Sequence, residues 1–100
     1  MSVSKVRWEW DPNKAALNLR RHRVPLELAA IALETDTFHL SKLDADSAEI
    51  RFRTLAMIEN LILVIVHTEP TIERYSGDWV GRIISARKAE PAERRAYHNG

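Results

Sequence analysis

Two adjacent apolar runs constrain the fold of this 100-residue chain more than any other feature. Residues 50–58 and 61–68 each have the length and composition of a β-strand, and only Glu59-Asn60 separates them. This two-residue separation predicts a tight antiparallel hairpin, although neither residue is the glycine that is usual in such turns. The second run is apolar on both faces, so we expect it to be a central strand covered on both sides.

The region before the hairpin has the signals of one short strand and two helices. Residues 6–10 alternate between apolar and charged side chains, which predicts a half-buried strand. Asp11-Pro12 is typical of an N-cap followed by proline at the first helical position, so a helix is expected to run to about Arg21. A second helix is expected to open at Pro25. The inner stripes predicted for the two helices are Ala15, Ala16 and Leu19 in the first and Leu26, Ala29, Ala30 and Leu33 in the second.

The rest of the chain adds a last strand and a last helix. Residues 35–49 lack a clear period and are interpreted as mostly loop, in which residues 37–40 are suited to a short strand. A polar loop over residues 69–78 leads to a strand predicted at residues 79–87. Pro91 opens a C-terminal helix, whose sheet-facing residues are expected to be Ala92, Ala96 and Tyr97.

These elements predict an α+β fold: a small antiparallel sheet with two N-terminal helices and one C-terminal helix. Because 45% of the 100 residues are hydrophobic, we expect one domain over residues 1–100 with one modest core. No apolar run is long enough to span a membrane, and residues 1–7 lack the apolar segment of a signal peptide. The predicted location is therefore the cytoplasm. The lack of cysteine excludes disulfides and thiolate metal sites.

Several classes of functional site find no support. The four histidines are far apart and have no carboxylate pair at ligand spacing, so no metal or other cofactor is predicted. No glycine-rich phosphate loop or nucleophile elbow occurs. The net charge is only +1, but residues 1–24 hold six basic and two acidic groups, whereas residues 25–50 hold one basic and six acidic groups. Both ends of the chain are basic, which indicates either a phosphate-binding face or solvated surface charge.

Arginines within the predicted strands are the main candidates for function. Arg51 and Arg53 share one face of the first hairpin strand, because side chains alternate along a strand. The tight turn pairs Arg51 with Thr68, and it pairs Phe52 with His67. His67 is therefore expected on the face opposite to the two arginines, unless a bulge intervenes or the site wraps over the strand ends.

A ribonuclease that uses the 2′-hydroxyl as nucleophile needs a base, an acid and cations for the charge on the phosphorane. Arginine supplies the cation well, because its planar guanidinium meets two phosphate oxygens and stays charged. Arg82 and Arg87 are the candidates, although they point to opposite faces of a strand unless Gly81 or the strand end changes its direction. Glu69 or His67 is the candidate base.

Each of these polar and aromatic residues has a structural alternative. His67 can simply end a buried strand, and Glu69 can pair with a nearby arginine. Trp8, Trp10 and Phe52 are suited to stacking on bases, but such aromatics more often belong to a core, and Trp10 is interpreted in that way.

Three blocks of residues occur in a specific order and spacing. The first is Trp10-Asp11, Lys14, Asn18, Arg21-His22, Val24, Leu26 and Ala29, and the second is Arg51-Phe52, Thr54-Leu55 and His67-Thr68-Glu69. The third block is the most specific, and it consists of residues 82–89 followed by Glu93-Arg94 and Tyr97. With these blocks the chain resembles the BrnT toxins, small ribonucleases whose fold is similar to that of RelE.

The resemblance implies RNA cleavage without a metal, neutralisation by a BrnA-like ribbon-helix-helix antitoxin, and contact with operator DNA only through that antitoxin. On this basis Arg82 and Arg87 are assigned to transition-state charge, and Glu69 or His67 to proton transfer. Contacts to the RNA backbone are expected from Lys14, Arg51, Arg53 and Lys88. The alternatives are a catalytically inactive module of the same fold that binds nucleic acid or the antitoxin, and a structural protein with no nucleic-acid role.

The chain departs from the family pattern at four positions. Arg23 and Ala56 stand where glycine is usual, which removes backbone freedom there. Pro70 stands where arginine is usual, so part of the usual cationic site is expected to be missing, and the loop that follows is longer. Gly81 replaces a β-branched residue, which predicts a bulge in the last strand.

Overall fold

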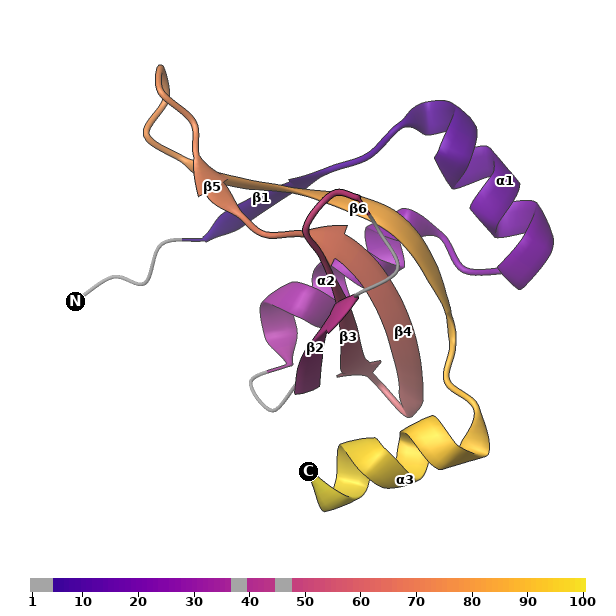
Figure 1. Ribbon diagram of the computed structural model, residues 1–100. Helices are drawn as coiled ribbons and strands as arrows, with labels where there is room; N and C mark the ends of the chain where they lie inside the picture. The colour runs from indigo at the N-terminus through magenta and orange to yellow at the C-terminus, as the bar shows by residue number, and fades with distance from the viewer. Residues whose placement is uncertain (1–4, 37–39, 45–47) are drawn as a thin grey trace.

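Helices pack against both faces of a mixed sheet in the computed structural model of the chain, which describes residues 5–36, 40–44 and 48–100 (Figure 1). In these ranges the elements are β1 (Val6–Glu9), α1 (Pro12–His22), α2 (Leu26–Thr35), β2 (Leu40–Asp44), β3 (Arg51–Ile58), β4 (Leu61–Thr68), β5 (Thr71–Ile72), β6 (Trp79–Lys88) and α3 (Pro91–Asn99). The predicted α+β class is therefore confirmed, with two helices near the N-terminus and one at the C-terminus.

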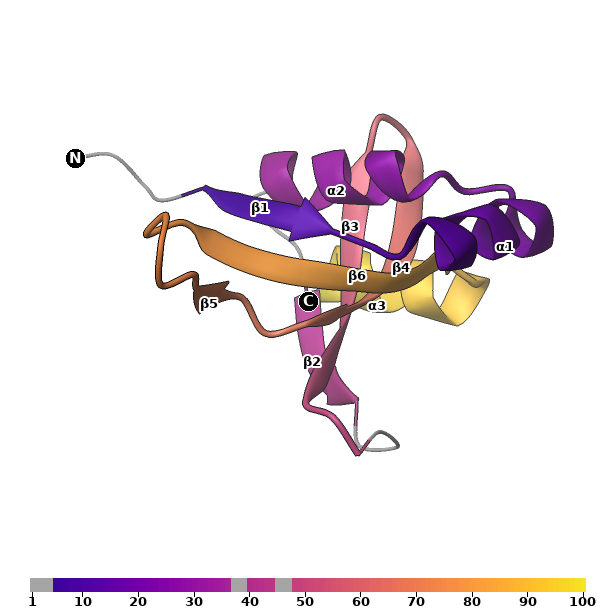
Figure 2. The ribbon, with the colours of Figure 1, turned by 90° about the horizontal axis from the view of Figure 1, so that it is seen from above.

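The strand order within the described residues is β1-β6-β4-β3-β2, and β5 pairs with part of β6. Strands β3, β4 and β6 are antiparallel neighbours, as expected, and β2 pairs with β3 in the antiparallel direction. Strand β1 departs from the expected antiparallel sheet, because it runs parallel to β6 and lies alongside it (Figure 2). The two strands are joined through nearly the whole chain, so no tight turn forces them to be antiparallel.

The central hairpin forms in the predicted register. Arg51 pairs with Thr68, and Phe52 pairs with His67. The turn residue Glu59 adopts a left-handed backbone with φ 55°, a conformation that glycine or asparagine usually supplies. Glu59 therefore closes the two-residue turn without glycine, and β4 is buried on both faces as predicted.

Two layers of apolar side chains hold the helices to the sheet. Helix α2 covers the face that carries Ala56, Leu63, Ile65 and Ile83, and these residues form the larger core cluster with Leu26 and Ala29 of the helix. The opposite face carries Leu55, Ile62 and Val64, against which Ala89 and Tyr97 pack. Only Glu93 and Tyr97 of α3 are partly buried, whereas the predicted sheet-facing residues Ala92 and Ala96 are exposed.

Helix α1 begins as predicted but faces the sheet with a different side. The Asp11 carboxylate accepts a hydrogen bond from the backbone N–H of Asn13 at 2.8 Å, which confirms the N-cap. Of the predicted inner stripe, Ala15 packs against the larger core, whereas Ala16 is exposed and Leu19 is 47% exposed. The prediction is therefore wrong for Ala16 and Leu19. Asn18 is buried in their place, with only 5% exposed.

Asn18 completes the hydrogen bonding of the β6 edge. Its side-chain amide donates to the carbonyl of Ala86 at 2.8 Å and accepts from the Ala86 N–H at 3.0 Å. The same amide donates to the carbonyl of Val24 at 2.9 Å, which fixes the connection to α2. The side chain thus acts as a one-residue strand partner. Buried backbone N–H and C=O groups need hydrogen-bond partners, and this requirement favours a polar residue at position 18. The apolar periodicity from which the inner stripe was predicted does not reveal this requirement.

Two short strands lie in regions interpreted as loop. Strand β2 occupies residues of the segment 35–49, and β5 occupies part of the segment 69–78. Both are stabilised by pairing with a neighbouring strand, β3 or β6, rather than by a local period in the sequence. Most of the short strand considered at residues 37–40 lies outside the described residues.

The predicted bulge in the last strand is present, but it is not at Gly81. Val66 pairs with Ser85 while His67 pairs with Ile83, so Ile84 is the extra residue of β6. Gly81 has a different role: a Cβ there would lie 2.9 Å from Cε3 of Trp8 and closer still to Cζ3. The absence of a side chain lets the indole of Trp8 lie directly over β6.

Replacing Asn18 with alanine tests the edge hydrogen bonds. Asn18→Ala leaves the Ala86 N–H and two carbonyls without their partner, so we expect the free energy of unfolding to fall by roughly 2–4 kcal/mol. Urea denaturation monitored by circular dichroism measures the change. Asn13→Ala, on the exposed side of the same helix, serves as the control and should change it by less than about 0.5 kcal/mol. Equal effects of the two substitutions would refute the role of Asn18.

The Trp8–Gly81 contact is testable by a double-mutant cycle. Gly81→Ala should destabilise the protein by about 1–3 kcal/mol, because the indole must move away from the added methyl group. In a Trp8→Leu background the same substitution should cost clearly less, since the obstructing ring is gone. An unchanged cost in that background would show that another contact excludes the side chain.

Candidate active site

Four arginines from two strands lie on one face of the sheet, which we call the arginine face. Arg51 and Arg53 of β3 stand opposite Thr68 and Val66 of β4, so their side chains share a face with these residues. On the other side of β4, Arg87 of β6 stands opposite Val64, which belongs to the same face. The fourth member is Arg82, whose backbone N–H donates to the Thr68 hydroxyl at 2.9 Å.

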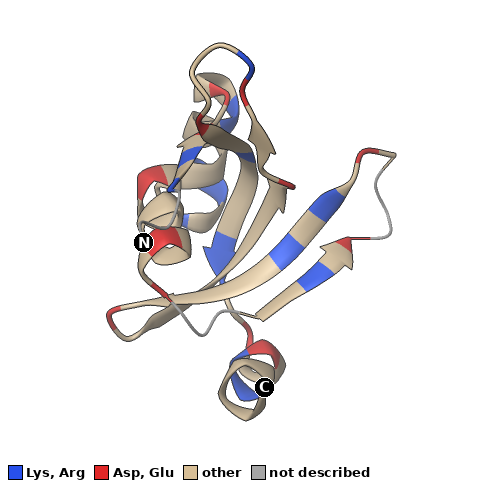
Figure 3. Ribbon diagram, turned by 90° about the vertical axis from the view of Figure 1, so that its left-hand side faces the viewer, with Lys and Arg blue, Asp and Glu red and all other residues tan. Residues whose placement is uncertain are grey.

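The β6 bulge determines this arrangement. In an uninterrupted strand, residues 82 and 87 would project to opposite faces, because side chains alternate along the strand. The extra residue Ile84 shifts the alternation by one position, so that Arg82 and Arg87 share a face while Ile83 and Ala86 both remain in the core. Figure 3 shows basic residues along neighbouring strands and acidic residues concentrated near loops and strand ends.

Each arginine of this face contacts a carboxylate. Glu49 accepts two hydrogen bonds from Nη2 of Arg82, at 2.8 and 3.0 Å, and one from Nε of Arg51 at 3.3 Å. These hydrogen bonds, with that from Arg82 the stronger, hold the pKa of Glu49 below its usual value. Glu49 is thus a carboxylate that bridges β3 and β6 at one end of the arginine face.

Glu93 has the same relation to Arg87 at the other end. The guanidinium donates from Nη1 and Nη2 to the two carboxylate oxygens, both at 2.8 Å. This bidentate pair lowers the pKa of Glu93 and raises that of Arg87. Glu93 also accepts from the backbone N–H of Glu90 as part of the capping box that begins α3. The start of α3 therefore places the carboxylate beside Arg87.

A half-buried contact at the other end of α3 joins the helix to the rest of the fold. Asp36 accepts a hydrogen bond from the hydroxyl of Tyr97 at 2.6 Å and another from the backbone N–H of Met57 at 2.7 Å. The hydrogen bond to the carboxylate and partial burial raise the pKa of Tyr97 to about 12. This contact joins α3 to the end of α2 and to β3, and so it positions Glu93 indirectly.

Positive charge exceeds negative charge on the arginine face. Lys42 stands opposite Arg53, and Asp44 lies 4.0 Å from Nη2 of Arg53. Four arginines and one lysine thus accompany three carboxylates among the described residues. A cavity of about 220 Å³ opens where α3 meets the sheet, and its lining is Leu40, Lys42, Arg53, Leu55, Ala92, Glu93 and Ala96.

His67 lies on the opposite face from the arginines. Its ring contacts Trp8 edge-on at a centroid distance of 5.0 Å and stacks near Phe52 at 6.0 Å. Nε2 is 2.6 Å from the hydroxyl of Thr54, and Nδ1 is 2.8 Å from the carbonyl of Thr68. With 7% exposed and both nitrogens in hydrogen bonds, His67 has the geometry of a structural residue.

The other residues singled out from the sequence are not gathered with the arginines. Glu69 is exposed just after β4 and makes no ion pair with any described residue. Lys88 stands opposite Leu63, which faces α2, and Lys14 lies on α1. Trp8 and Phe52 pack around His67, and Trp10 packs against the larger core as expected.

Sequence reasoning missed the carboxylates of the site. Glu49 lies in a segment interpreted as loop, and nothing in the sequence pairs it with a residue 33 positions away. Glu93 was detectable, since glutamate three residues after Glu90, with Pro91 between, is the signature of a capping box. That signature predicts a local contact, but it does not predict the second contact to Arg87.

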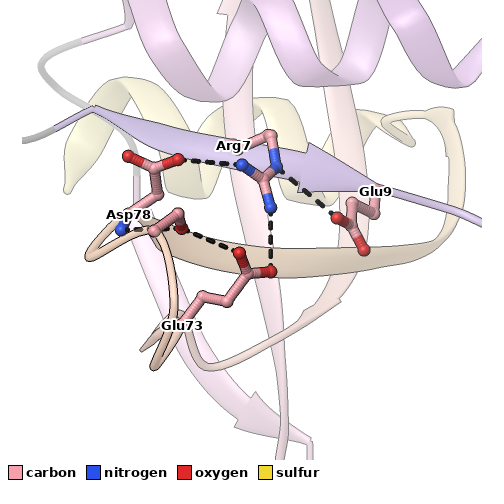
Figure 4. Close-up of polar contacts among 5 residues, drawn as sticks. Arg7, Glu9, Glu73 and Asp78 are labelled. Carbon is pink, nitrogen blue, oxygen red and sulfur yellow. Dashed lines mark hydrogen bonds and ion pairs between the residues drawn. The ribbon is translucent and has the colours of Figure 1, made fainter.

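A separate ion cluster lies at the far end of β1. Arg7 contacts Asp78 at 2.9 Å, Glu73 at 3.0 Å and Glu9 at 3.5 Å, and Ser76 donates to Glu73 at 2.7 Å (Figure 4). Three carboxylates around one guanidinium make this end acidic. The cluster fastens the loop between β5 and β6 to β1, and it is unsuited to an anionic ligand.

Neither a metal site nor a membrane-spanning helix is found within the described residues. In those ranges no group of three or more histidine, aspartate or glutamate side chains is placed to hold a metal ion. None of the helices described there is long and apolar enough to cross a membrane.

The chain matches a known protein family. The family model described as "Ribonuclease toxin, BrnT, of type II toxin-antitoxin system" matches residues 10–93. This range begins directly after β1 and includes all the arginines of the arginine face and Glu93. No curated protein matches the chain.

The Arg87–Glu93 pair makes a pH-dependent contribution to stability. The pKa of Glu93 is lower in the folded protein, so the pair stabilises the fold above the usual glutamate pKa of 4.5 and loses this effect as the pH falls through the folded value. Glu93→Gln should therefore lower the unfolding free energy by about 1 kcal/mol or less at neutral pH, and by clearly less at an acidic pH below the folded pKa of this carboxyl.

Urea denaturation of both proteins at the two pH values measures this difference. Glu34→Gln is the matched control, because Glu34 is exposed on α2 and makes no ion pair with a described residue. A Glu93→Gln penalty that persists in acid would show that the carboxylate acts by packing or capping instead of by charge.

Proposed function

Because the chain belongs to the BrnT family of ribonuclease toxins of type II toxin-antitoxin systems, we propose that it cleaves RNA with the arginine face as its active centre. The observation that carries the proposal is the β6 bulge, which gives Arg82 and Arg87 the same face as Arg51 and Arg53. On this face a polyanion would contact a row of guanidinium groups, and each of them is suited to bidentate contact with a phosphate.

In this proposal, RNA phosphates replace the carboxylates that now contact the arginines. Glu49 and Glu93 each offer two oxygens at hydrogen-bond distance to a guanidinium, which is the geometry that a phosphate also offers. Arg82 and Arg87 stand about four residues of β4 apart, or roughly 13 Å along the strand. The two ends of the face therefore hold successive parts of one RNA strand, and Arg51 and Arg53 contact the backbone between them.

The chemical step in this proposal is attack of a 2′-oxygen on the adjacent phosphorus. A bond forms between the 2′-oxygen and phosphorus while the bond from phosphorus to the 5′-oxygen breaks, which leaves a 2′,3′-cyclic phosphate and a 5′-hydroxyl. The 2′-hydroxyl gives its proton to a carboxylate, and the leaving 5′-oxygen takes a proton from that carboxyl group or from water. Arginines stabilise the additional negative charge on the phosphorane, so the step is proposed to need no metal.

Two carboxylates compete for the role of proton acceptor. Glu49 is favoured by position, because it contacts Arg82 and Arg51 on the arginine face. Glu69 is the second candidate, since it follows Thr68 directly and has no ion pair with a described residue that would hold it. His67 is least suited to proton transfer, because it faces the other side of the sheet with both nitrogens occupied.

We further propose neutralisation by a BrnA-like ribbon-helix-helix antitoxin, through which the pair would contact operator DNA. Type II systems pair each toxin with a protein antitoxin, and the family match supports such a partner. An acidic antitoxin segment placed on the arginine face would occupy the guanidinium groups as Glu49 and Glu93 do. It would thereby block RNA from the same atoms.

Cleavage of RNA by the purified protein in the presence of EDTA tests the active centre. Arg82→Ala and Arg87→Ala should each lower the rate by on the order of 10²-fold, because each removes a cation from the transition state. Arg20→Ala, an exposed position on α1, is the matched control and should retain the rate. Comparing Glu49→Gln with Glu69→Gln decides which carboxylate takes the proton, since only the acceptor's loss should lower the rate strongly.

A second candidate function follows from the same contacts. Since each arginine already has a carboxylate partner, the face would also suit a binding module that never cleaves. Folded protein that binds RNA in a salt-sensitive way but leaves it intact would favour this module and contradict the ribonuclease. Binding that is absent or insensitive to salt would contradict both.

A further inference from the structure

A second basic cavity lies between α1 and β6, apart from the ion pairs of the arginine face. Its volume is about 200 Å³, and its lining is Lys14, Leu17, Asn18, Arg21, His22, Ile84 and Ser85. At roughly 30 Å³ for each water-sized group, it is large enough for a phosphate group with some of its hydration. Figure 1 shows α1 beside the curved part of β6, and the residues that line the cavity belong to these two elements.

The charge of this cavity is not neutralised locally. Two of its lining residues, Lys14 and Arg21, are cationic, His22 adds ring N–H donors, and none is acidic. None of the three makes an ion pair with a described residue, in contrast to the four arginines of the arginine face. An anion entering the cavity would therefore displace only water.

The fold fixes the face of α1 that carries the two cations. Lys14 and Arg21 flank Asn18 at spacings of four and three residues, so they share its face of α1. Asn18 is bonded to the backbone of β6, which fixes this face of the helix against the strand. The geometry that completes the β6 edge thus also keeps the two cations beside it.

The cavity adjoins the arginine face through Ser85. This residue lines the cavity, and it stands opposite Val66 on the side of the sheet that carries Arg53 and Arg87. Ser85 is two residues from Arg87, or roughly 7 Å along the strand. The bulge residue Ile84 also lines the cavity, so the irregularity that aligns the arginines shapes this cavity as well.

We propose that this cavity binds a backbone phosphate of the RNA strand that lies on the arginine face, an inference that rests on the proposed function. Lys14 and Arg21 supply the charge, and Ser85 and the His22 ring supply further hydrogen-bond donors. The strand crosses β6 at the bulge. The protein therefore prefers single-stranded RNA of several nucleotides over the shortest substrate with one scissile phosphate.

Binding of a short single-stranded oligonucleotide with 2′-deoxy sugars, which cannot be cleaved, tests the cavity separately from catalysis. Lys14→Ala/Arg21→Ala should weaken binding by on the order of tenfold. It should also make the negative slope of log affinity against log salt concentration shallower by about 1.4. Lys5→Ala/Arg20→Ala removes the same two residue types from exposed positions outside the cavity and is the matched control. Its slope should change much less.

Two further measurements complete the test. In cleavage assays the cavity variant should lose rate on long RNA but retain it on a dinucleotide, which is too short to reach the cavity. Inorganic phosphate, followed by amide chemical shifts at Ser85, distinguishes a site for free phosphate from one that needs RNA. Equal effects of the two double variants on oligonucleotide binding, or shifts with phosphate that RNA does not reproduce, would overturn the proposal. Thermal melting verifies that both variants are folded. If Lys14→Ala/Arg21→Ala is not folded, Lys14→Gln/Arg21→Gln replaces it.

Discussion

The register shift between β4 and β6 decides on which side of the sheet the arginines of β6 lie. One extra residue, Ile84, lets β6 place Ile83 and Ala86 in the core while Arg82 and Arg87 both face away from α2. Without the shift, either an arginine would be buried without a partner or an apolar residue would be exposed, and burial of an unpaired charge is the more costly. One extra residue in β6 is thus enough to bury the apolar side chains and to keep both arginines on the same face.

The carboxylates that contact the arginines lie where, in the proposed function, RNA phosphates would bind. Glu49 accepts hydrogen bonds from the guanidinium group of Arg82, and Glu93 accepts them from that of Arg87. Both oxygens of each carboxylate take part, at distances of 2.8–3.0 Å. Such pairs at a partly exposed surface contribute little free energy, so a polyanion can replace them at small cost. The cavity between α1 and β6 has no such internal anion, which makes the two basic regions different in what a ligand must displace.

The sequence predicted the register of the central hairpin, because a two-residue gap between two strand-like runs leaves few ways to pair them. It also predicted the start of α1 and of α3, since an N-cap with a following proline is a local signal. It failed for the buried face of α1, where a hydrogen-bonding requirement of β6 selects Asn18 in place of an apolar stripe. It also failed for β2 and β5, which depend on a partner strand.

For the candidate site, the chemistry of the residues was readable but their grouping was not. Arginines on strands indicated an anionic ligand from the sequence alone, and the hairpin register placed Arg51 and Arg53 together and His67 opposite. Whether Arg82 and Arg87 join them depended on the position of one bulge, which arises from packing between β4, β6 and the helices. The partners Glu49 and Glu93 likewise come from segments that only the assembled sheet brings near. Local patterns determine elements because neighbouring residues interact through the backbone, whereas the convergence of distant charges is decided by how those elements pack.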